Sequence, residues 1–224
     1  VSFRHPTLLS FGSLNLPMKK SVFFLMAILV VWIATSPFMP VSGARGTPGS
    51  PDFGYGGHLP ADRSSLDAIR LAANLNLDWV ALPIAWQAVM AQPNAQIAWS
   101  HLDPIFDAVA RSRVSVMISL TQPPAWAVTS TGPDPMLTAQ FLNQLLQRYP
   151  ALIQAVELFP AANTRQGWGA APDAKAYLNL FKVVQTQLQA GRLKPILVAG
   201  GLIPLSPQEP AQGMDDLVFL QKVY

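Results

Sequence analysis

The fold of this chain is decided by the stretch Val156-Glu157-Leu158-Phe159-Pro160-Ala161-Ala162-Asn163-Thr164-Arg165-Gln166-Gly167-Trp168-Gly169. It begins inside an apolar run, residues 153–159, which has the length and composition of a buried β-strand. A helical pattern follows at 174–190, with apolar residues spaced to lie on one helix face. The stretch therefore leads from a strand towards a helix, and the rest of the sequence shows whether this unit recurs.

Strand-like and helical runs alternate along the whole chain. The predicted strands are 53–58, 79–84, 114–120, 153–159 and 195–199, and the predicted helices are 64–75, 101–112, 136–149, 174–190 and 215–224. Strands that are apolar almost throughout bury both faces, as in parallel sheets. Alternating units of this kind build either a doubly wound sheet or a barrel. A nucleotide-binding doubly wound sheet is disfavoured, because the glycines of 53–57 lack the G-x-G-x-x-G spacing.

The quoted stretch resembles the strand-four signature of clan A glycoside hydrolases, which usually reads Glu-x-Trp-Asn-Glu-Pro-Asn. Further segments are similar to landmarks of these enzymes, in the same order: 79–86 to the second strand with its closing Trp, 97–103 to the entry into helix two, 123–127 to the turn after strand three, and 198–202 to the end of strand five. The resemblance covers about 52–224 and implies an α/β fold, a (β/α)8 TIM barrel of glycosidase type. A complete barrel takes about 250 residues. We therefore expect 53–224 to be a partial barrel holding about the first five βα units.

The departures from the signature bear on catalysis. In these retaining O-glycosyl hydrolases, the Glu that follows the Asn is the acid/base, and a Glu on strand seven attacks the sugar. Here the acid/base position is Ala161 and the preceding Asn position is Pro160, while Ala81 replaces the Arg usual near the end of strand two. Alanine cannot donate a proton. The strand-seven position would lie beyond Tyr224, so the sequence leaves open whether the protein is an enzyme.

Other carboxylates are poor substitutes for the missing acid. The chain has two glutamates, Glu157 and Glu209. Glu157 lies about 13 Å down the strand from Ala161 at ~3.3 Å per residue, so we interpret it as a hydrogen-bonded interior group. Glu209 follows strand five in a Pro-rich loop and is a weak candidate acid. Asp134 and Asp173 precede predicted helices, where carboxylates act as N-terminal caps.

Aromatic residues supply the candidates for substrate binding. Trp86, Trp126 and Trp168 each follow a predicted strand, at the end where barrel active sites form. Their rings are suited either to stack on a sugar or to cover the barrel top as core. Asn163 matches the last Asn of the signature, and His58 ends strand one, where a structural hydrogen bond is the alternative to chemistry. No His and carboxylate spacing fits a metal site, so we predict no metal and no cofactor.

The first 44 residues have the parts of an export signal. Met18-Lys19-Lys20 is a basic start, 22–34 is an apolar run, and Ser42-Gly43-Ala44 offers small residues for cleavage. We therefore predict a signal peptide at 18–44, an extended or spurious N-terminus at 1–17, and a linker at 45–52. The alternative is a membrane anchor, although spanning needs about 20 apolar residues and this run is shorter.

Charge and cysteine content narrow the function classes. The chain carries 15 Lys+Arg against 12 Asp+Glu, and the only charged residues in 1–44 are Arg4, Lys19 and Lys20. The remainder is neutral, which removes any reason to expect a nucleic-acid partner. The absence of cysteine excludes disulfides, thiolate metal sites, a Cys nucleophile and a lipidated Cys.

These observations lead to one functional expectation and two alternatives. We expect a secreted or extracytoplasmic glycoside hydrolase-like protein, catalytically impaired, that binds carbohydrate. It would meet a membrane only through an uncleaved signal segment. The first alternative is an active O-glycosyl hydrolase with a non-standard acid and a nucleophile beyond Tyr224. The second is a surface scaffold that uses the barrel top to bind proteins.

The export signal generates a first prediction. The mature protein should begin at Arg45, because Ser42 and Ala44 are small enough for the signal peptidase pocket. Intact-mass measurement of the secreted protein checks this. A mass that still includes 22–34 would contradict cleavage and indicate an anchor.

Overall fold

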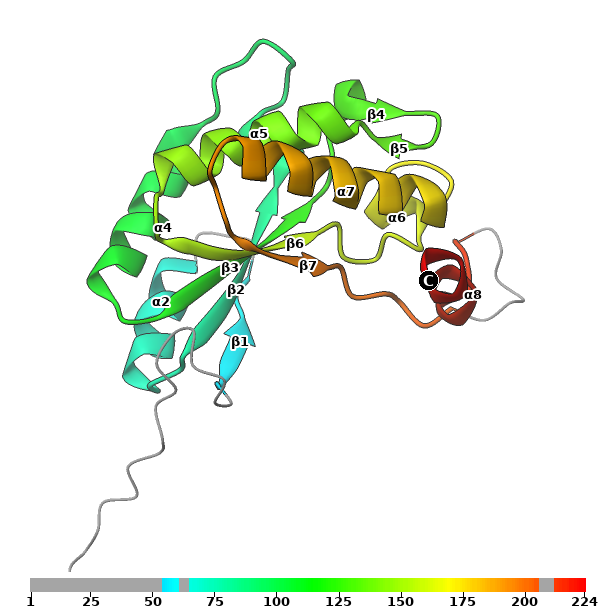
Figure 1. The fold of residues 1–224 in the computed structure, drawn as a ribbon. Helices are drawn as coiled ribbons and strands as arrows, with labels where there is room; N and C mark the ends of the chain where they lie inside the picture. Colours follow the sequence, from blue (N-terminus) through cyan, green and yellow to red (C-terminus); the bar gives the residue numbers. More distant parts are fainter. Residues whose placement is uncertain (1–53, 61–64, 206–211) are drawn as a thin grey trace, which may run out of the picture. The chain divides into compact units, whose positions relative to one another are not determined.

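A computed structural model describes residues 54–60, 65–205 and 212–224 (Figure 1). The chain divides between Ala44 and Arg45, and all the described residues belong to the second part. The predicted N-terminal extension, signal peptide and linker lie outside the described residues, and so does Glu209.

The described residues contain one sheet of five parallel strands. The strands are β1 (Gly56–His58), β2 (Trp79–Ala85), β3 (Ser115–Thr121), β6 (Ile153–Leu158) and β7 (Ile196–Ala199), paired in the order β1-β2-β3-β6-β7. Each strand along the chain is added beside the previous one, as in a barrel, whereas a doubly wound sheet reverses direction at a switch point. The predicted parallel sheet of barrel type is confirmed.

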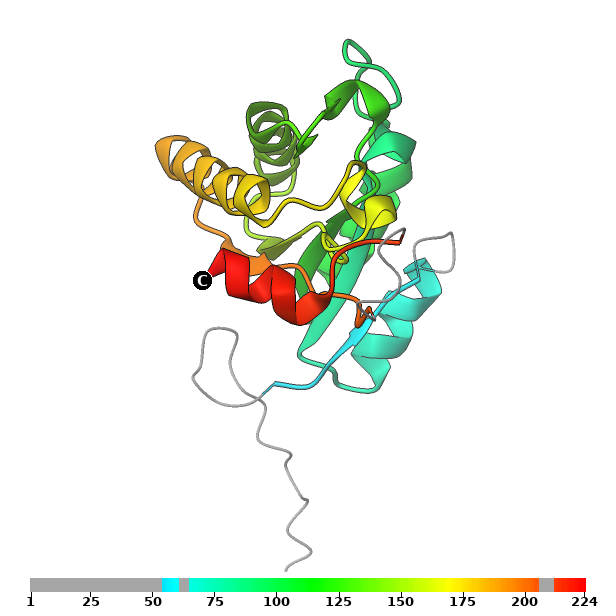
Figure 2. The same cartoon turned by 90° about the vertical axis from the view of Figure 1, so that its right-hand side faces the viewer.

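Helices follow the strands in the predicted alternation. The longer ones are α2 (Ser65–Asn74), α4 (Trp99–Arg111), α5 (Pro135–Arg148), α7 (Ala174–Ala190) and α8 (Asp216–Val223). Neighbours in this series pack together, α2 on α4, α5 on α7, and α7 on α8. Figures 1 and 2 show α5 and α7 side by side over the same face of the sheet.

Several short elements that the sequence did not predict follow the ends of the strands. They are α3 (Trp86–Val89) after β2, the 3-10 turn Ala125–Ala127 after β3, the antiparallel pair β4 (Val128–Thr129) and β5 (Gly132–Pro133), and α6 (Arg165–Trp168) after β6. Elements of two to four residues are too short to show a hydrophobic period, which is why pattern analysis missed them.

The core lies between the sheet and the helices. Alternate strand residues point towards the helices, and these are almost completely buried: Val80, Leu82, Ile84, Val116, Ile118, Leu120, Val156 and Leu158. Burial of each of these valine, isoleucine and leucine side chains stabilises the fold by about 1.5–3 kcal/mol. The opposite face is smaller and more polar, with Ser119 paired in register to Glu157. Hydrophobic packing therefore stabilises the face of the sheet that contacts the helices, and the opposite face carries the polar side chains.

Acidic caps begin the later helices. Asp134 accepts hydrogen bonds from the backbone N–H groups of Met136 and Leu137. Asp173 does the same for Lys175 and Ala176. These bonds satisfy donors that have no partner inside a helix. The predicted capping roles of Asp134 and Asp173 are confirmed.

Tyr177 joins α7 to the ends of two strands. Its hydroxyl donates to the Leu158 carbonyl over 3.1 Å and accepts from the Gly200 N–H over 2.8 Å. Burial raises the pKa of this hydroxyl, so it stays protonated and able to donate at neutral pH.

This junction generates a second prediction. Tyr177→Phe should lower the free energy of unfolding by about 1–2 kcal/mol, because Leu158 and Gly200 lose their partner in a largely buried position. Urea denaturation monitored by circular dichroism measures the loss. Tyr224→Phe, at a fully exposed tyrosine, is the control and should change stability by less than about 0.5 kcal/mol. Equal stability of both variants would show that the Tyr177 hydroxyl contributes nothing.

Candidate functional site at the carboxyl ends of the strands

The chain leaves β6 through a strained, hydrogen-bonded turn. Phe159 and Ala161 have positive φ angles, +47° and +63°, which are uncommon for residues other than glycine. The Phe159 N–H donates to the Leu120 carbonyl, and the Ala161 N–H donates to the Gly201 carbonyl over 2.6 Å. The turn is therefore tied to β3 on one side and to the end of β7 on the other.

Ala161 lies at the tip of this turn and has no functional group. Its carbonyl accepts both the backbone N–H and the hydroxyl of Thr164, each over 2.8 Å. Helix α6 packs closely over it, so a Cβ at Gly167 would come within 2.3 Å of the Ala161 carbonyl oxygen. Position 161 is thus fixed in a local structure that presents only a methyl group.

Glu157 lies inside, four residues before Ala161. One carboxylate oxygen accepts from the Ser119 hydroxyl over 2.5 Å, and the other accepts from the Gly201 N–H over 3.1 Å. The side chain is buried, with 8% of its surface exposed. Both oxygens are engaged in joining β3 to the segment after β7, which confirms the interpretation of Glu157 as a hydrogen-bonded interior group.

The carboxyl ends of the strands and the segments that follow them form a rim, and Asn163, which follows β6, is completely buried within it. Its side-chain N–H2 donates to the carbonyls of Ile203 and Met214 over 2.7 and 2.9 Å, and its oxygen accepts from the Ile203 N–H over 3.0 Å. Both amide donors are used. Asn163 therefore clamps the chain on either side of 206–211.

Two of the three candidate tryptophans lie in the core. Trp86 is fully buried and stacks on Phe141, with ring centroids 4.9 Å apart. Trp168 is 1% exposed, and its indole N–H donates to the Thr131 carbonyl over 2.8 Å. A Cβ on Gly132, whose φ is +129°, would lie 2.1 Å from the Trp168 ring. For Trp86 and Trp168, the structure matches the core alternative.

Trp126 and His58 differ from these. Trp126 is partly exposed, its indole N–H donates to the Ala91 carbonyl over 3.1 Å, and its ring stands edge-on to Trp86 at 5.6 Å. His58 is exposed but pairs in register with Ala81, well before the carboxyl end of β2. His58 is the last residue of β1, as predicted, but β1 ends four residues short of the end of β2, whereas Trp126 lies beyond the end of β3.

An amide pair at the same rim was missed by the sequence analysis. The Gln87 N–H donates to the Gln122 carbonyl over 3.0 Å, and the Gln87 side-chain N–H2 donates to the Gln122 side-chain oxygen, also over 3.0 Å. Both side chains are exposed. The sequence feature that could have indicated this pair is its position, because each residue is polar and comes just after an apolar strand.

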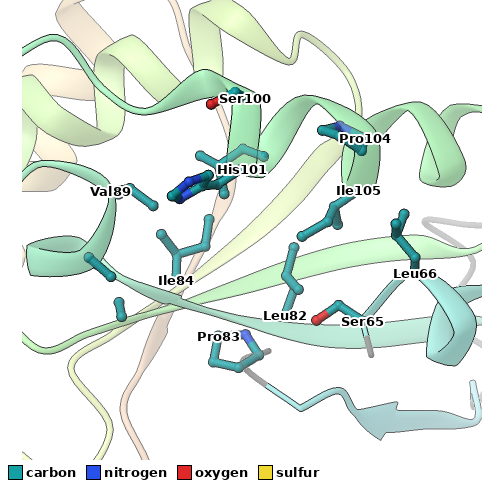
Figure 3. Close-up of a pocket in the computed structure, with 13 residues that line it drawn as sticks. Ser65, Leu66, Leu82, Pro83, Ile84, Val89, Ser100, His101, Pro104 and Ile105 are labelled. Atoms are coloured by element: carbon teal, nitrogen blue, oxygen red, sulfur yellow. The ribbon is translucent and has the colours of Figure 1, made fainter. Parts of the chain in front are cut away.

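A cavity of about 510 Å3 lies behind β2, on the helix side of the sheet. Figure 3 shows Leu82 and Ile84 beneath it and His101 and Ile105 of α4 above it. Its walls are mainly apolar and include Ala85 at the end of β2 and Val89 of α3, but not Trp126.

Residues 54–60, 65–205 and 212–224 contain neither a cluster of metal-binding side chains nor a membrane-spanning helix. No group of three or more His, Cys, Asp or Glu side chains in these ranges is placed to hold a metal ion. None of the helices in this part of the chain has the length and apolarity to cross a membrane.

Comparison with known proteins identifies the fold. No family model and no curated protein sequence matches the chain. A family 39 glycoside hydrolase structure from the gut symbiont Bacteroides cellulosilyticus WH2 matches with a TM-score of 0.51 at 18% identity, over 65% of this chain and 31% of that one. An endo-β-1,4-glucanase from Xanthomonas axonopodis pv. citri matches with a TM-score of 0.53 at 12% identity, over 75% and 60%.

This chain has part of a (β/α)8 barrel fold, similar to the fold of these glycoside hydrolases. A third match, XacCel5A in complex with cellopentaose, has a TM-score of 0.52 at 12% identity, over 75% of this chain and 60% of that one. The chain spans between about a third and three fifths of these proteins. At such identities the similarity establishes the fold and leaves the activity to be argued from the site.

The environment of Asn163 generates a third prediction. Asn163→Asp should lower the free energy of unfolding by about 2–4 kcal/mol, because a buried carboxylate would face the carbonyls of Ile203 and Met214 without a donor. Thermal and urea denaturation measure the change. Asn94→Asp, at an exposed position, is the matched control and should be nearly neutral. Unchanged stability of Asn163→Asp together with altered sugar binding would instead place Asn163 in the binding surface.

Proposed function

We propose that this chain is part of an extracytoplasmic, glycosidase-like barrel that binds carbohydrate and does not cleave it by the usual two-carboxylate route. The observation that carries the proposal is the end of β6. There the resemblance to the strand-four signature aligns Ala161 with the acid/base, and the structure holds Ala161 in a turn by hydrogen bonds to Gly201 and Thr164.

The chemistry of glycoside hydrolysis explains why this position matters. The reaction needs two carboxyl groups on either side of the glycosidic bond, one of which protonates the leaving oxygen. Glu157 is a poor substitute, because it is buried and each of its oxygens already accepts a hydrogen bond from Ser119 or Gly201. General acid assistance contributes about 10²–10⁴-fold in rate, so its loss would leave natural glycosides largely uncut.

Binding does not need the missing acid. A barrel rim binds a sugar through aromatic faces and a few polar groups, and Trp126 is a partly exposed aromatic at this rim. The similar fold of XacCel5A, whose structure contains cellopentaose, makes that β-linked oligosaccharide a suitable first probe. The extracytoplasmic location rests on the signal peptide predicted at 18–44.

A fourth prediction tests the proposal. The protein should bind at least one member of a panel of β-linked oligosaccharides that includes cellopentaose, and leave all of them uncut. Isothermal titration calorimetry measures binding, and chromatography of the sugars after long incubation measures cleavage. Trp126→Ala should weaken the binding without changing the cleavage result, because stacking on an aromatic face contributes about 1 kcal/mol, or roughly fivefold in affinity.

Two variants separate a lost acid from a lost active site. Ala161→Glu restores a carboxyl group at the strand end, and Ala171→Glu adds one at an exposed control position nearby. A gain in cleavage with Ala161→Glu alone would mean that a nucleophile survives and only the acid is missing. Efficient cleavage by the unmodified protein would contradict the proposal and favour an active hydrolase with a non-standard acid. Absence of both binding and cleavage would favour a scaffold.

A further inference from the structure

We infer that the amide pair Gln87–Gln122 is a hydroxyl-recognition subsite that binds two neighbouring hydroxyl groups of a sugar. This inference rests on the carbohydrate-binding function proposed above. It assigns a specific contact to two residues that show no resemblance to a catalytic motif.

The pair is held together by two hydrogen bonds. The backbone bond from the Gln87 N–H to the Gln122 carbonyl joins the start of α3 to the turn after β3. The side-chain bond, from the Gln87 N–H2 to the Gln122 oxygen, then aligns the two amides. Since the last register pair of β2 and β3 is Ala85 with Thr121, both glutamines lie just beyond the ends of paired strands.

The groups left over by this arrangement are complementary. Gln87 keeps its side-chain oxygen as an acceptor, and Gln122 keeps both of its side-chain N–H groups as donors. A hydroxyl group both donates and accepts, so two adjacent hydroxyls on a sugar ring can satisfy the acceptor and the donors together. Because the amides already restrain each other, less rotamer freedom is lost when a sugar binds.

The backbone of Gln122 is strained, and the turn itself does not require a glutamine there. Its φ is +50°, a left-handed conformation that glycine adopts freely and asparagine tolerates better than glutamine. Pro123 and Pro124 follow directly and are buried. Strain of this kind is concentrated at functional sites, where a side chain must be presented in one direction.

The amide pair and Trp126 belong to one corner of the rim. Trp126 follows Gln122 by four residues, and its ring packs edge-on against Trp86, which is the neighbour of Gln87 in the chain. The Trp126 indole N–H is already bound to the Ala91 carbonyl, so the ring is held in place. A fixed aromatic ring and a planar amide pair together provide the stacking and hydrogen-bonding groups that sugar recognition uses.

The alternative role of the pair is structural, namely to hold the ends of β2 and β3 together. The variant Gln122→Gly distinguishes this role from sugar binding. Gln122→Gly keeps the backbone bond to Gln87 and suits the positive φ, so the melting temperature should be unchanged or higher. It removes the side-chain donors, so the affinity for the oligosaccharide should fall about five- to tenfold. Gln87→Ala should cause a similar loss of affinity.

The experiment is titration of the full chain with the oligosaccharide that binds best in the panel containing cellopentaose. Wild type, Gln122→Gly, Gln87→Ala and the control Gln144→Ala, an exposed glutamine of α5, are compared by calorimetry and thermal melting. We expect weaker binding in the two rim variants, no melting loss in Gln122→Gly, and wild-type behaviour in the control. The double variant should bind little worse than either single one, because the amides act as a unit.

Two results would overturn the inference, and they differ from each other. Wild-type affinity in both Gln122→Gly and Gln87→Ala, with the wild type binding sugar, would reject the subsite and leave carbohydrate binding intact. Failure of the wild type to bind any sugar of the panel would reject the proposed function and the subsite with it.

Discussion

The hydrogen bonds of the Glu157 carboxylate connect the parts of the molecule on which its candidate site depends. Glu157 lies on β6 and accepts from Ser119 on β3 and from Gly201 after β7. The Gly201 carbonyl in turn accepts from Ala161, the tip of the turn that follows β6. A buried carboxylate is unfavourable unless such donors satisfy it, so Glu157 and its donors hold the ends of three strands in one arrangement.

At the carboxyl end of the sheet, the polar groups that hold the structure together lie apart from those that are available to bind a ligand. Near β6 and β7 the side chains of Glu157, Asn163 and Tyr177 are all engaged in hydrogen bonds within the protein. Near β2 and β3 the amides of Gln87 and Gln122 are exposed and keep unused donors and an acceptor. We therefore locate the proposed sugar contacts towards β2 and β3, although Ala161, aligned by the resemblance with the acid/base, comes just after β6.

Several buried side chains show why sequence patterns are ambiguous at strand ends. Trp86, Trp126 and Trp168 occupy similar positions in the sequence, but Trp86 and Trp168 are buried and Trp126 is partly exposed. The difference arises from Phe141 on α5 and from the β4–β5 hairpin, which cover Trp86 and Trp168 respectively. Both covering elements are distant in sequence or too short to predict. Asn163 is a similar case, because its partners Ile203 and Met214 come about 40 to 50 residues later.

The sequence by itself determined the alternation of strands and helices, the absence of an acid at Ala161, and the helix caps Asp134 and Asp173. These features are local, since they depend on side-chain periodicity, residue identity and contacts within a few residues. The tertiary structure alone decided which candidates are buried, that both oxygens of Glu157 are engaged, and that Gln87 meets Gln122. Those outcomes depend on the register between strands and on packing between distant segments, and strand pairing brings together residues that no local pattern connects.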